Sequence, residues 1–186
     1  MKQIRDLEIT TKEGFSVKNL KRFPSMEYGE NGGVEADVYY NGDLIMTVFD
    51  EGNGGCAITY TKELYNLKKG EINGKALTCL KRLDKNWDKY DWLKEKTPKD
   101  IDDDDWLGIV NIIEDYYDDY KQVKKAFKDG YKTIAVLSND FQKAYLRYRV
   151  GDITIKEVEA YLNAHNLTKT YPDIYIINDL AKATTI

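Results

Sequence analysis

The sequence predicts an α+β protein, and three observations support that fold class. A hairpin signature lies in the first third of the chain, a helical spacing of apolar residues follows, and short apolar runs flank a helix start near the end. We therefore expect an N-terminal antiparallel β-meander (1–60), central long amphipathic helices (61–130) and a C-terminal β-β-α-β segment (131–186). Pro, Ser and Gly are too sparse for a flexible linker, so we expect a single domain over residues 1–186.

The N-terminal meander is centred on the pair Asn41-Gly42. Both central positions of a two-residue type I′ turn need positive φ angles, which Asn and Gly tolerate best. Such a turn sets the strand register, and the expected pairs are Tyr40–Asp43, Val38–Ile45, Ala36–Thr47 and Val34–Phe49. The face expected in the core carries Val34, Ala36, Val38, Tyr40, Ile45 and Phe49. The half-exposed face carries Glu35, Asp37, Tyr39, Leu44, Met46 and Val48.

Further elements are expected on either side of this hairpin. Residues 15–23 and 56–60 are strand-like runs, which gives a meander of three to four strands. From residue 61 to 96, leucines and aromatic residues recur at helical spacing, and Gly70 and Gly74 are expected to divide this region into two helices.

The longest expected element is a helix from about Asp102 to Asp129. On a helical wheel at about 100° per residue, its large apolar residues occupy one arc and its acids the opposite arc. The apolar arc contains Trp106, Ile109, Val110, Ile112, Ile113, Tyr116, Tyr117, Tyr120, Val123 and Phe127. Leu107 is the one large apolar residue on the acidic side, and Gly130 is a natural helix stop.

The last segment begins with a buried-type strand at 132–137. Residues 144–150 form a second element, whose spacing fits a strand or a helix. Thr154 and Glu157 form a capping box that predicts a short helix, and 174–177 is a final apolar strand.

The charge pattern is most uneven at residues 100–120, which hold nine carboxylates and no Lys or Arg. Acids at a helix start favour the helix dipole, but Glu114/Asp118 and Asp115/Asp119 are like-charge pairs at i, i+4, each costing a few tenths of a kcal/mol. Nine charges over about 31 Å of helix approach the phosphate spacing of one DNA strand. Two interpretations stay open: a solvated face, or a surface that binds a basic partner.

Other patterns for a site are weaker. Loop 51–55, with Gly52, Gly54 and Gly55 beside Asp50 and Glu51, suggests an anion nest or a cation site, but it lacks the Lys-Ser/Thr ending of a phosphate-binding loop. A tight connection between strands is the competing interpretation. The mixture of Tyr145, Arg147, Tyr148 and Arg149 fits either single-stranded nucleic acid or a strand paired with the acidic helix.

Chemistry based on cysteine or histidine is not indicated. Cys56 and Cys79 have no metal-ligand spacing, and His165 has no partner motif. No nucleophile motif surrounds Ser138 or Cys56, so we expect no catalytic residue, no metal and no cofactor. The N-terminus lacks the apolar run of a signal peptide, no segment is long enough for a membrane span, and the reduced cysteines predict a cytoplasmic protein.

Residues 34–55 resemble a group of small uncharacterised proteins of phages and mobile elements. The shared pattern is a strand, a tight turn around Asn-Gly, a second strand and a loop with the spacing Asp/Asn-x-Gly-x-Gly-Gly, here residues 50–55. Members commonly end with a strand-helix-strand segment, which is similar to residues 132–177. The resemblance implies an accessory role against host defence, such as that of an anti-CRISPR protein. It implies no catalytic residues.

We therefore predict a non-enzymatic anti-defence protein that acts in the cytoplasm, which is the host cytoplasm if a phage encodes it. Its acidic surface is expected to occupy the basic groove of a host defence nuclease or ribonucleoprotein, without binding nucleic acid or membrane itself. The residues expected to bind this partner are Asp103, Asp104, Glu114, Asp115, Asp118, Asp119, Glu35 and Asp37.

Two further expectations follow from the sequence. Because the apolar arc stays intact and the like-charge pairs only change sign, changing Glu114, Asp115, Asp118 and Asp119 to Lys should alter stability by no more than about 1 kcal/mol. The alternative function is a small ligand-binding protein or enzyme with a pocket at loop 51–55.

Overall fold

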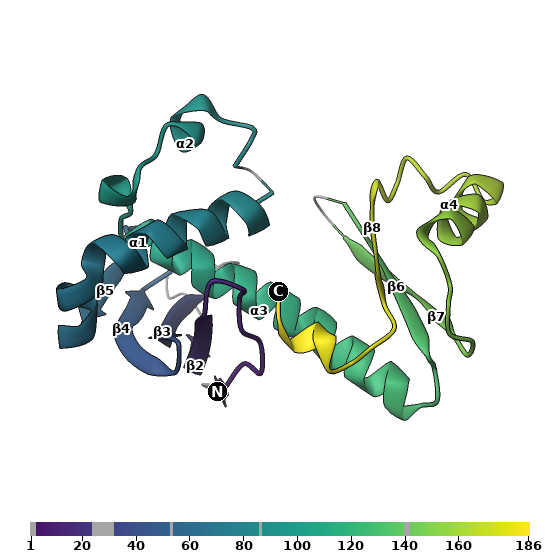
Figure 1. Cartoon of the computed structure of the whole chain (residues 1–186), viewed down its shortest axis with the longest axis horizontal. Helices are drawn as coiled ribbons and strands as arrows, with labels where there is room; N and C mark the ends of the chain where they lie inside the picture. Colours follow the sequence, from purple (N-terminus) through teal and green to yellow (C-terminus); the bar gives the residue numbers. More distant parts are fainter. Residues whose placement is uncertain (1–2, 24–31, 53, 86, 140–141) are drawn as a thin grey trace. The chain divides into compact units, whose positions relative to one another are not determined.

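The computed structural model describes residues 3–23, 32–52, 54–85, 87–139 and 142–186, and its fold is α+β, as predicted (Figure 1). The chain divides into two compact units: unit 1 comprises residues 1–117 with 185–186, and unit 2 comprises residues 118–184. The boundary lies within a helix and not in a linker, so the composition of the chain does not mark it. The single domain stays a prediction.

Unit 1 contains a five-stranded antiparallel sheet in which the strands follow one another in chain order. The strands are β1 (Gln3–Arg5), β2 (Phe15–Phe23), β3 (Gly33–Tyr40), β4 (Asp43–Asp50) and β5 (Ile58–Thr61). The predicted meander is confirmed, with β1 as a strand that the sequence did not indicate. Alternate side chains of β3 are buried, and these are Val34, Ala36, Val38 and Tyr40.

The β3–β4 hairpin turns at Asn41-Gly42, whose φ angles of 51° and 91° are the positive values that the turn requires. The pair Tyr40–Asp43 is confirmed. Beyond it, an irregularity of the β-bulge type shifts the register by one residue, so the predicted pairs Val38–Ile45, Ala36–Thr47 and Val34–Phe49 are wrong. The observed pairs are Val38–Met46, Ala36–Val48 and Val34–Asp50.

The shifted register changes which face of β4 is buried. Ile45 and Met46 are both fully buried, although they are consecutive, because the bulge interrupts the alternation of side chains. Val48 is also buried and Phe49 is only half-buried, so the predicted placement of Met46, Val48 and Phe49 is wrong. A one-residue slip moves every later side chain to the opposite face.

Two helices pack on this sheet and share an aromatic contact with it. Helix α1 (Glu63–Leu83) is one helix with a kink at Lys68, so the division at Gly70 and Gly74 is wrong. Helix α3 (Asp103–Lys128) begins and ends within one residue of its predicted bounds. The buried Trp106 of α3 makes edge contacts with Phe15 of β2 and with Tyr65 of α1.

Residues 84–102, here called the arm, connect α1 to α3 and carry α2 (Asp91–Lys94) away from the sheet of unit 1 (Figure 1). A short 3₁₀ helix (Pro98–Asp100) follows α2 in the arm. The side chains of Trp87, Leu93 and Ile101 in the arm are buried, and Asn73 of α1 donates a hydrogen bond to the Pro98 carbonyl at 2.9 Å.

Unit 2 confirms the predicted β-β-α-β segment. It consists of β6 (Thr133–Ser138), β7 (Lys143–Tyr148), α4 (Ile155–Ala164) and β8 (Asp173–Ile177), with the antiparallel strand order β7-β6-β8. The capping box of Thr154 and Glu157 starts α4 as expected. All six residues of β6 are buried, because the end of α3 packs on one face of this sheet and α4 on the other.

Candidate functional site

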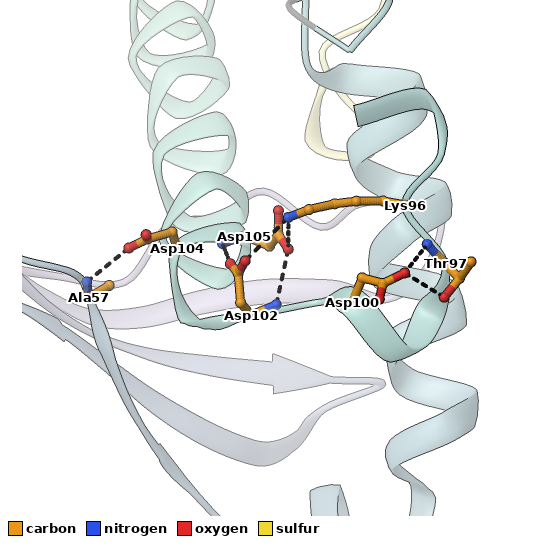
Figure 2. A network of polar contacts seen from close by, with 7 residues as sticks. All are labelled: Ala57, Lys96, Thr97, Asp100, Asp102, Asp104 and Asp105. Carbon is orange, nitrogen blue, oxygen red and sulfur yellow. Dashed lines mark hydrogen bonds and ion pairs between the residues drawn. The ribbon is translucent and has the colours of Figure 1, made fainter. Parts of the chain in front are cut away.

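The nine carboxylates of residues 100–120 do not form one solvent-exposed face. Asp100, Asp102, Asp103, Asp104, Asp105, Glu114 and Asp115 belong to unit 1, and Asp118 and Asp119 belong to unit 2. The five acids Asp100, Asp102, Asp103, Asp104 and Asp105 lie at or just before the start of α3 and are here called the carboxylate cluster. Figure 2 shows all of them except Asp103.

Backbone amides close to the start of α3 hold three members of the carboxylate cluster in place (Figure 2). Asp100 Oδ2 accepts hydrogen bonds from the Thr97 backbone N at 2.8 Å and from Thr97 Oγ1 at 2.6 Å. Asp102 and Asp105 accept one hydrogen bond from each other's backbone N, both at 3.0 Å. These bonds satisfy amides that a helix start leaves without partners, which explains why acids stand at these positions.

Asp103 binds the edge strand β5 of the unit 1 sheet, and Asp104 binds the residue just before that strand. The Ala57 amide donates to Asp104 Oδ1 at 2.9 Å, and the Thr59 amide donates to Asp103 Oδ2 at 3.1 Å. Thr59 Oγ1 also donates to Asp103, at 2.8 Å. These carboxylates therefore complete the outer edge of β5, which as an edge strand presents amide groups that no further strand pairs with.

Lys96 is the cation that pairs with the carboxylate cluster. Its side chain is 12% exposed, and its Nζ lies 2.6 Å from Asp105 and 3.4 Å from Asp102. Burial raises the pKa of Asp105. Burial acts in the same direction on Asp102, but the Asp105 amide and the Lys96 charge outweigh it, so the pKa of Asp102 is lowered. Hydrogen bonds from Thr97 lower the pKa of Asp100, so Asp100 and Asp102 are ionised at neutral pH.

Glu114 of unit 1 is occupied by internal contacts. It forms ion pairs with Arg5 and Arg22, and its side chain is largely buried. Arg22 also donates to Asn111 at 2.8 Å. Asp115, the next residue, is exposed.

The two acids of the hairpin, Glu35 and Asp37, are half-buried and make cross-strand contacts. Lys21 Nζ lies 2.5 Å from Glu35. Thr47 Oγ1 and Asn19 Nδ2 donate to Asp37 at 2.7 and 2.8 Å. These acids therefore stabilise the pairing of neighbouring strands.

In unit 2, Asp119 is buried at 4% exposure and accepts hydrogen bonds from three side chains. Tyr145 donates to its Oδ1 at 2.6 Å, and Tyr175 donates to its Oδ2 at 2.6 Å. Lys143 Nζ lies 3.1 Å from the same Oδ2. Asp118 is exposed and pairs with Lys121 at 2.7 Å.

These contacts explain the like-charge pairs along α3. The cations for two of these acids come from other elements, Arg5 and Arg22 for Glu114 and Lys143 for Asp119, whereas Asp118 pairs with Lys121 of the same helix. The expected tolerance of four Lys substitutions is therefore revised, because Lys at 114 would face two arginines and Lys at 119 would bury an unpaired charge.

The glycine-rich loop, the two cysteines and His165 were the other candidates for a site. Gly52 donates its amide to Asp50 at 2.9 Å and closes the start of loop 51–55, in which Asn53 lies outside the described residues. Cys56 is exposed, whereas burial raises the pKa of the Cys79 thiol to about 12. The exposed His165 ring contacts the Tyr161 carbonyl at the end of α4.

Comparisons with protein-family models, with curated proteins and with solved structures found no match. In the described part of the chain, no group of three or more His, Cys, Asp or Glu side chains is arranged to hold a metal ion. No described helix is both long and apolar enough to cross a membrane. A functional proposal therefore depends on the geometry of the side chains themselves.

Proposed function

We propose that this protein is a non-enzymatic inhibitor of the anti-CRISPR kind, which binds the basic nucleic-acid groove of a host defence nuclease. The carboxylate cluster of unit 1 is the surface that enters the groove. The proposal narrows the expected surface, because Glu114, Asp119, Glu35 and Asp37 are engaged in internal contacts.

The observation that carries the proposal is a set of carboxylates held rigidly at the surface. Asp100, Asp102 and Asp104 are exposed, yet each accepts a hydrogen bond from a backbone amide. A charged side chain that is already fixed loses little conformational entropy when it binds. These three exposed carboxylates, with the less exposed Asp103 and Asp105 and with Lys96 beside them, thus form a preorganised anionic surface.

The physical basis of inhibition is competition for a cationic groove. Basic grooves attract polyanions over a Debye length of about 8–10 Å, which raises association rates and makes binding sensitive to salt. A fixed group of carboxylates competes with phosphates for the same lysines and arginines. The bound inhibitor fills the groove, so the nuclease cannot bind its nucleic-acid substrate there. The inhibitor is a folded protein and is not cleaved in its place.

The test is a triple variant that removes charge but keeps the acceptors: Asp100→Asn, Asp102→Asn and Asp104→Asn. The Asn side chain retains one oxygen and is a good helix cap, so the variant should fold. A matched control removes the same charge from three exposed acids of unit 2, with Asp129→Asn, Asp152→Asn and Glu159→Gln.

The partner is first isolated from nuclease-treated host lysate by pull-down with the wild-type chain and identified by mass spectrometry. The purified partner is then assayed for cleavage of its nucleic-acid substrate. We expect wild type and control to inhibit cleavage. The triple variant should need a concentration at least about tenfold higher for the same inhibition. Equal inhibition by the triple variant, or a partner without a nucleic-acid groove, would contradict the proposal.

A further inference from the structure

The arm of unit 1 exposes two large aromatic side chains next to each other. Tyr90 and Trp92 are 52% and 61% exposed, and their rings stack with centroids 6.3 Å apart and an interplanar angle of 30°. The same arm buries Trp87, Leu93 and Ile101. The arm therefore has an inner side that packs on unit 1 and an aromatic pair that this packing leaves in solvent. Exposed Trp and Tyr are the residue types that most often anchor protein interfaces.

Lys96 shows which kind of group this surface binds. Its Nζ lies 5.6 Å from the centroid of the Trp92 ring, and it also forms the ion pairs with Asp105 and Asp102. One cation is thus held by an aromatic face and by the carboxylate cluster at the same time. Lys96 also places the aromatic pair directly beside the cluster, within the same unit.

The charge around the aromatic pair favours a cationic partner over a nucleic acid. Residues 84–105 contain nine carboxylates and five lysines. Lys96 is paired within the cluster, and Lys94 pairs with Asp91 at 3.4 Å. Asp91 lies between the two aromatic residues in sequence and is fully solvent-accessible. Phosphates would be repelled by this excess of carboxylates, whereas aromatic stacking alone would suit either ligand.

We infer that the Tyr90–Trp92 pair, together with Asp91 and the carboxylate cluster, binds an arginine-bearing segment of a protein partner. Arginine fits better than lysine, because its planar guanidinium stacks on an aromatic ring while it donates two hydrogen bonds to a carboxylate. An arginine of the partner would make the same two kinds of contact that Lys96 makes within the arm, one with an aromatic ring and one with a carboxylate. This inference rests on the proposed function, for which it names the anchor of the interface.

The test measures binding of a fluorescein-labelled nona-arginine peptide by fluorescence anisotropy, at low and at physiological salt. The variant combines Tyr90→Ala and Trp92→Ala. The matched control combines Tyr60→Ala and Leu67→Ala, which removes two other exposed apolar side chains of unit 1. Circular dichroism melting of both variants verifies that they fold, and nona-lysine and a labelled oligothymidylate serve as competing ligand classes.

We expect the wild type and the control to bind nona-arginine with equal affinity. The Tyr90/Trp92 variant should bind it at least about tenfold more weakly, and the wild type should bind nona-lysine more weakly than nona-arginine. Unchanged binding by the folded variant would overturn the inference, as would preference for oligothymidylate or no binding of nona-arginine. If only the Asp100/Asp102/Asp104 variant loses the peptide, the inference fails and the proposed function stands. If the aromatic pair binds the peptide but the same Asp variant still inhibits the nuclease, the proposed function fails.

Discussion

The carboxylate cluster and Asp119 are parts of one acidic stretch, yet they carry their charge in opposite ways. The cluster receives its hydrogen bonds mostly from backbone amides, and several of its members stay at the surface. Asp119 receives hydrogen bonds from three side chains and is buried. Backbone donors organise a carboxylate while leaving its charge open to a partner. Side-chain donors from two strands enclose it.

The difference has a geometric cause in each unit. The acids of the cluster cap amides at a helix start and along an edge strand, two places where the backbone leaves donors without backbone partners, and three of these acids stay exposed. In unit 2, Tyr145 on β7 and Tyr175 on β8 both pair with Val136 of the central strand β6. The two hydroxyls therefore approach Asp119 from both sides of that strand. The acidic stretch of residues 100–120 thus contains carboxylates at the surface of unit 1 and a buried carboxylate in unit 2.

The largest expected effect comes from Asp119→Ala. This change leaves two tyrosine hydroxyls and the Lys143 ammonium without their acceptor, and we expect a loss of about 2–4 kcal/mol in the free energy of unfolding. Urea unfolding followed by circular dichroism measures it. Asp118→Ala is the neighbouring control, and its exposed ion pair predicts a loss below about 0.5 kcal/mol. Equal stability of the two variants would mean that Asp119 does not hold unit 2 together.

A smaller effect is expected for Asp103→Ala. The substitution removes the acceptor of two hydrogen bonds from Thr59, at a cost of about 1–2 kcal/mol. It also leaves an amide of the edge strand β5 unpaired, so self-association should rise with protein concentration in size-exclusion chromatography. Asp103→Asn keeps one acceptor and should lie between wild type and Asp103→Ala. A monomeric Asp103→Ala variant with wild-type stability would show that α3 does not protect this edge.

Local patterns in the sequence predicted the elements that depend on near neighbours. The bounds of α3, the turn at Asn41-Gly42 and the capping box of α4 follow from helical spacing, positive φ and short-range hydrogen bonds. The shift of β4 at Ile45 could not be predicted in this way. Two-residue turns and alternating apolar residues are compatible with both registers, and packing of the whole sheet selects the one that buries Ile45 and Met46.

The candidate site was predicted as a composition but not as a geometry. A charge count identifies residues 100–120, but the partners that remove Glu114 from the surface, Arg5 and Arg22, lie about a hundred residues earlier in the chain. The aromatic pair was missed for a related reason. The helical spacing of leucines and aromatic residues over 61–96 does not say which of them reach solvent, and Tyr90 and Trp92 of the arm are exposed.

The smallest expected effect is a change with pH in the stability that Asp100, one of the carboxylates held by backbone amides, contributes to the fold. Hydrogen bonds from Thr97 lower the pKa of Asp100 below its ordinary value of 3.8. A lowered pKa in the folded state means that the ionised group stabilises the fold above its unfolded pKa, and that this contribution disappears as pH falls through the folded pKa. Asp100→Asn should therefore be less stable than wild type at pH 6, and the difference should shrink as pH falls below the ordinary pKa of 3.8. Thr97→Val, which removes one of the two donors, should show the same trend with a smaller difference. Urea unfolding at pH 6, 4 and 3 measures both. A difference that stays constant with pH would show that the hydrogen bonds from Thr97 do not favour the ionised form of Asp100.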